Sequence, residues 1–233
     1  MNKTKIEWCL NPDGSPGYSW NPIKGLCPMD CKTPDGKSYC YARKIYKRFH
    51  FPQWLHFDSE NYHEPLLIKK SSGIFICSTI ELFHPETNQN HWRDNIFDII
   101  EHCPQHRFYI LTKLPQNIDR PMPPNVWLGT TITDRKNEVN SLLLIEHQAK
   151  IKFLSIEPFF EPIVFSLENI NWIIVGCLTE HGYKYDPRIE WIEEIIGQAR
   201  RFSISVFLKN NLIPILGWEF VKEHQEWPKE KLA

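Results

Sequence analysis

Residues 73–113, GIFICSTIELFHPETNQNHWRDNIFDIIEHCPQHRFYILTK, contain the pattern that decides the fold. A β-branched and aromatic run at 73–78 predicts a buried strand, and a similar run at 107–113 predicts the next one. Between them, the sequence predicts a helix from about 90 to 102. Strands that alternate with helices indicate right-handed strand–helix–strand units and a parallel sheet.

The same alternation continues to the end of the chain. Helices are expected over roughly 135–147 and 189–201, and a basic helix begins at Tyr41. The further apolar runs that predict strands are 125–131, 152–158, 172–177 and 203–209. We therefore expect an α/β fold in which about six parallel strands form a complete or partial (β/α) barrel, with residues 1–233 as a single domain. Before residue 40 we expect irregular structure with at most a short strand at 6–10.

Composition excludes several classes of protein. The 233 residues are 42% hydrophobic and 24% charged, with a net charge of -1, which is typical of an ordinary globular protein and gives no overall attraction to nucleic acid. The N-terminus lacks the apolar core of a signal peptide, and no apolar run is long enough to span a bilayer. Seven unevenly spaced cysteines do not suit a secreted disulfide framework, so we expect a cytoplasmic protein.

Three cysteines lie in a short loop that is rich in proline and glycine. Residues 20–43 read WNPIKGLCPMDCKTPDGKSYCYAR and contain Cys27, Cys31 and Cys40. Turn residues allow three sulfurs to converge without helical spacing, and thiolates suit zinc, copper(I) or iron–sulfur iron. The segment therefore predicts a metal site with these cysteines as ligands.

Spacing alone leaves three interpretations of these cysteines open. A closed zinc site needs a fourth ligand, which Cys9 or His50 could supply. A 4Fe-4S cluster with an open iron needs no fourth protein ligand. The third interpretation is that the thiols are unrelated.

Polar side chains follow the apolar runs, and the carboxyl ends of the strands of such a barrel build its active site. Lys113 and Lys209 directly continue a strand, so we expect both at its mouth. Glu157 precedes Pro158, whose fixed φ would hold the carboxylate in one direction. Some of these residues could instead cap helices or form turns. The other candidates at strand ends are Ser78, Thr79, Glu81, Thr112, Thr130, Thr131, Thr179, Glu180 and Asn210.

Several blocks of the sequence resemble one family. They are Lys5-Ile6-Glu7-Trp8, Trp20-Asn21-Pro22, Gly25, Cys27, Cys31, Cys40-Tyr41-Ala42, Leu111-Thr112-Lys113, Trp127-Leu128-Gly129, Leu154-Ser155-Ile156-Glu157-Pro158 and Phe207-Leu208-Lys209. Together they resemble the phage-type three-cysteine-motif family, which is similar to radical S-adenosylmethionine (SAM) enzymes. Three departures are visible. The gap between Cys31 and Cys40 is longer than the usual two residues, Glu81 stands where the family has aspartate, and residues 176–180 differ from its Gly-Gly-Glu-Ser-Gly block.

The resemblance implies a function and roles for the candidate residues. A 4Fe-4S cluster would be bound by the three loop cysteines, would chelate SAM and, when reduced by an electron donor, would cleave it to a 5'-deoxyadenosyl radical. Glu157, Lys113 and Lys209 would face the substrate or the SAM carboxylate. The residues implied in SAM binding are Ser78, Thr79 and Glu81 near its amino group and Thr130 and Thr131 near its ribose.

The helix from Tyr41 suggests a partner. Residues 41–50 interleave tyrosines with basic side chains, which suits either an ordinary solvated helix face or the binding of nucleic acid. Together with the phage association that the resemblance implies, the second interpretation makes a nucleic-acid base the expected substrate. Two further readings of the whole chain stay open. One is a zinc-stabilised, non-catalytic nucleic-acid-binding protein, and the other is a metal-independent hydrolase that uses Glu157 with Lys209.

Overall fold

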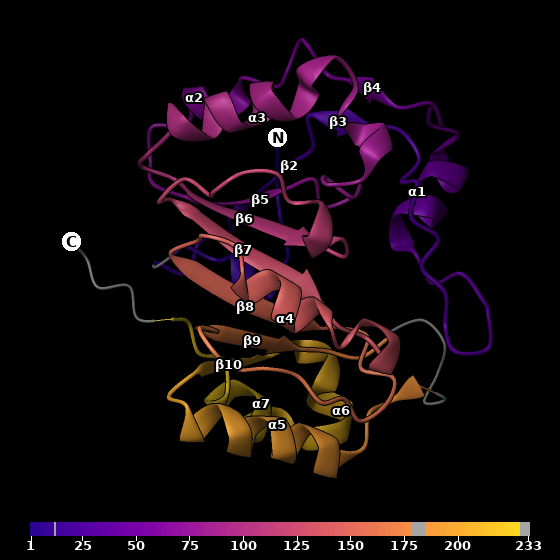
Figure 1. Cartoon of the computed structure of the whole chain (residues 1–233), viewed down its shortest axis with the longest axis vertical. Helices are drawn as coiled ribbons and strands as arrows, with labels where there is room; N and C mark the ends of the chain where they lie inside the picture. The colour runs from indigo at the N-terminus through magenta and orange to yellow at the C-terminus, as the bar shows by residue number, and fades with distance from the viewer. Residues whose placement is uncertain (12, 179–184, 229–233) are drawn as a thin grey trace.

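The computed structural model of the protein describes residues 1–11, 13–178 and 185–228. Over these residues the fold is mixed α/β, built on a sheet of eight strands in the order β1-β2-β5-β6-β7-β8-β9-β10 (Figure 1). All neighbours from β2 to β10 are parallel, and β1 is antiparallel to β2 at one edge. The strands are β1 (Asn2–Lys3), β2 (Tyr18–Trp20), β5 (Gly73–Ile76), β6 (Arg107–Thr112), β7 (Val126–Thr131), β8 (Ile151–Ile156), β9 (Trp172–Val175) and β10 (Ser205–Leu208).

The remaining elements cover this sheet and its ends. A small antiparallel pair, β3 (Ile23–Lys24) and β4 (His56–Phe57), lies apart from it. The helices are α1 (Tyr41–Phe49), α2 (Glu64–Leu67), α3 (Trp92–Glu101), α4 (Asn140–Ile145), α5 (Ile189–Arg201), α6 (Ile213–Leu216) and α7 (Trp218–Glu223). Short 3-10 helices are Glu7–Cys9, Pro85–Thr87, Gln89–His91, Pro115–Asn117, Arg135–Asn137 and Asn210–Leu212.

The parallel sheet and the alternation of strands with helices are confirmed. All six expected strands form, and β1 and β2 extend the sheet beyond them. The helix expected over roughly 135–147 is divided into a 3-10 helix at Arg135–Asn137 and the shorter α4.

The expectation of a short strand at 6–10 is wrong. Glu7–Cys9 is a 3-10 helix that buries both Trp8 and Cys9, whereas a strand would point these neighbours to opposite faces. Its Glu7 carboxylate accepts a hydrogen bond from the Asn210 backbone N–H at 3.0 Å. The strand that joins the sheet in this part of the chain is β2, which pairs with β5.

The two faces of the sheet pack against different partners, as a buried parallel sheet requires. Aliphatic side chains on one face, such as Ile110 and Leu128, belong to a core that includes Ile96 and Ile100 of α3 and Ile196 of α5. The opposite face is aromatic. Its buried rings are Phe75, Tyr109, Trp127, Phe153, Trp172 and Phe207.

Trp8 covers the aromatic face. Its ring centroid lies 5.0 Å from that of Phe75 and 5.2 Å from that of Tyr109, and the ring also contacts Phe153 and Trp172. The backbone carbonyl of Trp8 accepts a hydrogen bond from the Trp227 indole at 3.1 Å. The N-terminal and C-terminal segments are thereby joined over the same face of the sheet.

None of the helices in the described part of the chain is long and apolar enough to cross a membrane.

Gly129→Ala should destabilise the fold by about 1–3 kcal/mol. A Cβ atom at position 129 would lie 2.3 to 2.6 Å from three carbons of the buried Phe153 ring. The free energy of unfolding from urea titration measures the effect. Gly197→Ala in α5 is the control, because nothing lies within 4 Å of a Cβ atom placed there. It should raise the free energy of unfolding by about 0.5–1 kcal/mol. A Gly129→Ala protein as stable as the wild type would contradict this packing.

Candidate functional site

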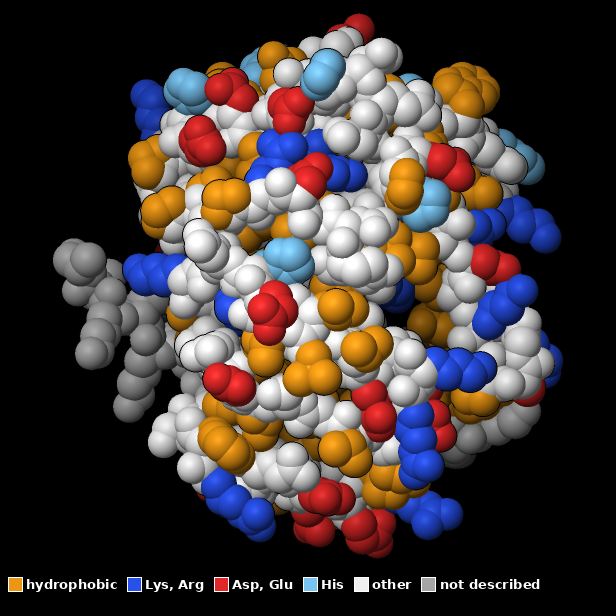
Figure 2. Space-filling model, viewed as in Figure 1, with side chains coloured by type: hydrophobic (Ala, Val, Ile, Leu, Met, Phe, Trp, Pro, Cys, Tyr) orange, Lys and Arg blue, Asp and Glu red, His pale blue; other side chains and the backbone are white. Residues whose placement is uncertain are grey.

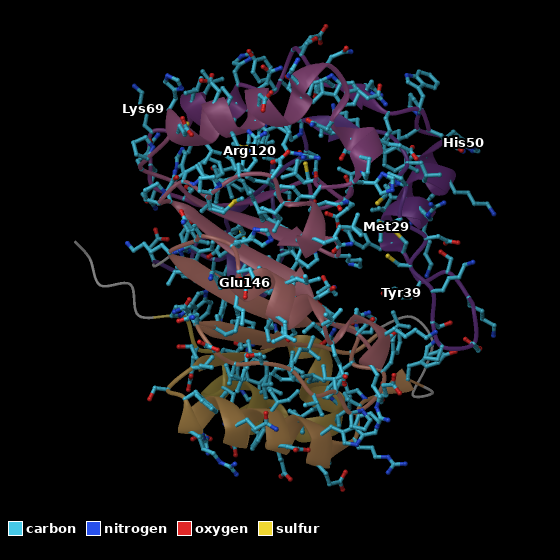
Figure 3. The ribbon with its side chains drawn as sticks, in the orientation of Figure 1. Met29, Tyr39, His50, Lys69, Arg120 and Glu146 are labelled. Carbon is cyan, nitrogen blue, oxygen red and sulfur yellow. The ribbon has the colours of Figure 1, made fainter. Side chains whose placement is uncertain are left out.

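A cavity of about 750 Å³ lies at the carboxyl ends of the parallel strands, on the side that faces α1 and the cysteine loop. Met29 and Tyr39 line it and lie near these strand ends, whereas His50 lies farther out, beyond α1 (Figure 3). The volume is typical of a site for a cofactor or substrate. Of the residues expected in the site, Cys27, Cys31, Cys40, Ser78, Thr79, Glu81, Lys113, Thr131, Glu157 and Lys209 line the cavity.

The three loop cysteines open into this one cavity. Arg43 of α1 holds the loop, because its guanidinium donates to the carbonyl oxygens of Cys27 at 2.8 Å and Met29 at 3.1 Å. Burial raises the pKa of the Cys27 and Cys31 thiols, and negative charge at the neighbouring Cys40 raises both further. In the described ranges, no group of three or more His, Cys, Asp or Glu side chains stands in a preformed metal-binding arrangement.

Neither proposed fourth zinc ligand lies with these thiols. Cys9 packs in the aromatic cluster, where burial raises its pKa to about 12, and its thiol donates to the Tyr18 carbonyl. His50 ends α1 at the opposite end from Cys40, and a helix of that length spans about 14 Å. A zinc ion held by the loop would therefore need a ligand other than these two residues.

Glu81 is a buried carboxylate with a complete set of donors. Its Oε1 accepts hydrogen bonds from the Thr112 hydroxyl at 2.5 Å and the Phe83 N–H at 3.2 Å, and its Oε2 accepts one from the Lys113 N–H at 2.8 Å. The side chain therefore ties the end of β6 to the segment after β5. This arrangement positions Lys113 at the cavity wall, so Glu81 supports the site as well as lining it.

Glu157 and Lys209 form an ion pair between the ends of β8 and β10. Asn211 donates to the Glu157 Oε1 at 3.3 Å and to the Cys177 carbonyl at 2.8 Å. Gly176 leaves space for the pair, because a Cβ there would lie 2.8 Å from the Glu157 Oε1 and 3.0 Å from the Lys209 Cδ. Both charged groups are about one-fifth exposed and can still reach a ligand in the cavity.

Asn21 organises the loop after β5. Its Oδ1 lies 3.2 Å from the Ser78 hydroxyl and 3.4 Å from both the N–H and the hydroxyl of Thr79. Cys77, just before them, has a φ of 52°, in the region that favours glycine. A buried residue held in this conformation turns the chain directly after the strand, which brings Ser78 and Thr79 to the cavity wall.

Thr130 does not line the cavity, and its hydroxyl donates to the Thr112 carbonyl at 3.0 Å. Successive strand residues point to opposite faces, so only Thr131 can face inward. The Thr131 hydroxyl is buried and has no hydrogen-bond partner among the described residues. It also lines a second cavity of about 200 Å³ that shares Cys31, Tyr39 and Lys113 with the first.

Two other strand-end candidates, Thr179 and Glu180, lie outside the described residues. Asn210 bonds to Glu7 and Lys222 rather than lining the cavity, and Thr112 is fully buried beneath Glu81.

Sequence reasoning missed several residues of the cavity wall. Lys5 and Glu7 lie far along the chain from the six expected strands, and only the family resemblance pointed to their block. Ser155 and Leu111 could have been found from strand alternation, since each lies two residues before an expected site residue, Glu157 or Lys113. Asn211 was not expected, because it lies beyond the strand end, within the 3-10 helix Asn210–Leu212.

Over the described residues, the fold and the cavity define a parallel α/β protein with a pocket lined by five cysteines, three lysines and three glutamates at the carboxyl edge of its sheet. The chain matches the family described as "Protein of unknown function (DUF5131)" over residues 3–213, so it belongs to this family. No curated protein and no solved structure matches the chain.

Glu81→Gln should destabilise the protein by about 1–3 kcal/mol. Both carboxylate oxygens accept hydrogen bonds, so an amide NH₂ group in place of one oxygen would face a donor. Chemical denaturation measures the loss. Glu86→Gln, an exposed change in the same segment, is the control and should stay within about 0.5 kcal/mol of the wild type. Equal stability of the two variants would show that Glu81 does not carry this network.

Proposed function

We propose that the protein is a radical SAM-like enzyme that binds a 4Fe-4S cluster through Cys27, Cys31 and Cys40 and uses SAM to modify or repair a substrate. In this proposal the parallel sheet is an open (β/α) barrel of the radical SAM type. The observation that carries the proposal is the meeting of the three thiols with the strand-end polar residues in one cavity.

The residues fit such a group on two grounds besides the thiols. The buried Thr131 hydroxyl has no partner among the described residues, and a ligand atom in the cavity would supply one. The cavity of about 750 Å³ has room for more than a metal centre alone. Three thiolates leave one iron of a 4Fe-4S cluster open, and the bound cluster supplies the one-electron reduction of SAM.

The chain's own residues would bind and orient the other ligands. Lys113 and Lys209 are cations at the wall and suit the carboxylate of an amino acid group. Glu157 is an acceptor for a cationic amino group, and Asn211 and Lys209 fix its direction. Trp8 and Phe75 belong to both the wall and the aromatic cluster, so they close the cavity toward the core and keep water from that side.

The proposal also implies a compartment and a partner. All seven cysteines are free, which suits a reducing cytoplasm. An electron donor must reach the cluster, and the loop of residues 27–40 is the part of the chain through which it would act. A zinc ion on the same three thiols is the competing assignment, and it would make the protein a non-catalytic binding module.

Protein purified without oxygen should contain about four iron atoms per chain and be brown. Elemental analysis and visible absorption measure this, and adding SAM under reducing conditions should change the spectrum. One zinc ion per chain in a colourless protein would overturn the proposal.

Cys31→Ala should remove most of the iron and the spectral response to SAM. Cys103→Ala is the matched control, because Cys103 is a fully buried cysteine that does not line the cavity, and it should keep the iron at a small cost in stability. If an activity survives in Cys31→Ala, the chemistry belongs instead to a metal-independent site such as Glu157 with Lys209.

A further inference from the structure

The apolar side of α1 faces solvent. Tyr41, Ile45 and Phe49 are four residues apart and therefore lie on one side of the helix, where they are 50%, 37% and 56% exposed. The other side of the helix attaches it to the protein. Ala42 is buried, Arg43 binds the cysteine loop as described above, and the Tyr46 hydroxyl accepts a hydrogen bond from the Gly25 N–H at 2.9 Å.

Aromatic rings continue this surface beyond the end of the helix. Phe51 is 47% exposed and stacks on Phe49, with ring centroids 5.6 Å apart and an angle of 22° between the planes. The Arg48 guanidinium lies 5.5 Å from the centre of the Phe49 ring. We call Tyr41, Ile45, Phe49 and Phe51 the α1 surface, together with Lys44 and Arg48, which lie beside them three residues after Tyr41 and Ile45.

The charge of this region is entirely positive. Residues 41–57 include Arg43, Lys44, Lys47 and Arg48 and contain no aspartate or glutamate, although the whole chain has a net charge of -1. Figure 2 shows Lys and Arg side chains gathered on the side of the molecule where α1 and the cysteine loop lie. An anionic partner is therefore attracted to this side of an otherwise neutral protein.

The α1 surface begins at the cavity. Tyr41 lines the cavity wall beside Cys40, and its hydroxyl donates to the Ser78 carbonyl. From Tyr41 to Phe49 the helix extends about 12 Å away from the cavity. A ligand that lies along the α1 surface can thus place one end in the cavity.

We propose that the α1 surface binds a single strand of nucleic acid and leads one of its nucleotides into the cavity. Single-stranded nucleic acid is then the substrate class of the proposed function, and the inference rests on that function. Bases stack on Tyr41, Phe49 and Phe51, and Lys44 and Arg48 contact the phosphates. Flat, exposed rings next to cations are the arrangement that binds single strands without sequence preference. A protein partner fits less well, because lysine is depleted at the centres of protein–protein interfaces and Lys44 flanks the rings.

Fluorescence anisotropy with a labelled single-stranded oligonucleotide of about 12 nucleotides tests this proposal. The wild-type protein should bind DNA or RNA single strands more tightly than the matching duplex, and the affinity should fall as salt is raised. DNA and RNA arms of the same sequence identify the preferred strand. Failure to bind either strand, or tighter binding of the duplex, would overturn the proposal.

The double variant Phe49→Ala/Phe51→Ala should weaken binding at least about tenfold. Phe49→Leu keeps apolar contact but removes stacking, so it should show a large part of the same loss of affinity. Arg48→Gln, which removes the cation beside the Phe49 ring, should lower the slope of log affinity against log salt by about 0.7. The controls are Phe202→Ala and Lys150→Gln, which change exposed residues away from α1 and should leave binding unchanged. Equal affinities for the double variant and the wild type would refute the stacking role.

Iron content measured on the same samples separates the two proposals. If the iron-loaded protein does not bind the strand, the proposed role of the α1 surface is refuted and the radical SAM-like function is not. Strand binding by a zinc-loaded, colourless protein refutes the radical SAM-like function and leaves the α1 surface supported.

Discussion

The packing of Trp8 onto the aromatic face of the sheet is the contact on which the rest of the structure depends. A parallel sheet has two apolar faces, and here the helices cover only one of them. A single 3-10 helix brings the Trp8 ring against four rings from β5, β6, β8 and β9. Burying a tryptophan in this way is worth about 3–5 kcal/mol. The same ring forms part of the cavity wall, so the contact that completes the core also builds the site.

Toward the carboxyl ends of the strands, the side chains on the aromatic face change from apolar to polar. The inward positions of β7 and β8 run from Trp127 and Phe153 to Thr131 and Ser155. The parallel register places Thr131 beside Ser155, so the polar residues form a continuous edge instead of isolated positions. The carboxylates beside this edge have protein partners, since Glu81 accepts hydrogen bonds from the end of β6 and Glu157 pairs with Lys209.

The sequence predicted the six strands from β5 to β10 and part of the cavity wall, because the strands follow from local alternation and the polar wall residues from the rule that strand ends meet. Prediction failed where distant segments decide the conformation. Residues 6–10 alternate like a strand, yet Trp8 and Cys9 are both drawn into the aromatic cluster. Thr130 and Thr131 are both polar and adjacent, so alternation lets only one of them face the cavity, and the packing of β7 shows that it is Thr131. The helix at 41–49 was expected, but its Tyr41, Ile45 and Phe49 side faces solvent because Arg43 and Tyr46 anchor the other side.

Two hydrogen bonds described above join the ends of the chain around the cavity. Asn210 binds Glu7 across 203 residues, and Trp227 binds Trp8 across 219. During synthesis on the ribosome, the N-terminal segment emerges first, and these two partners follow only about 200 residues later. Contacts of such long range form slowly. The described cavity wall runs from Thr4 to Asn211, so the cavity is complete only after residue 211 has left the exit tunnel.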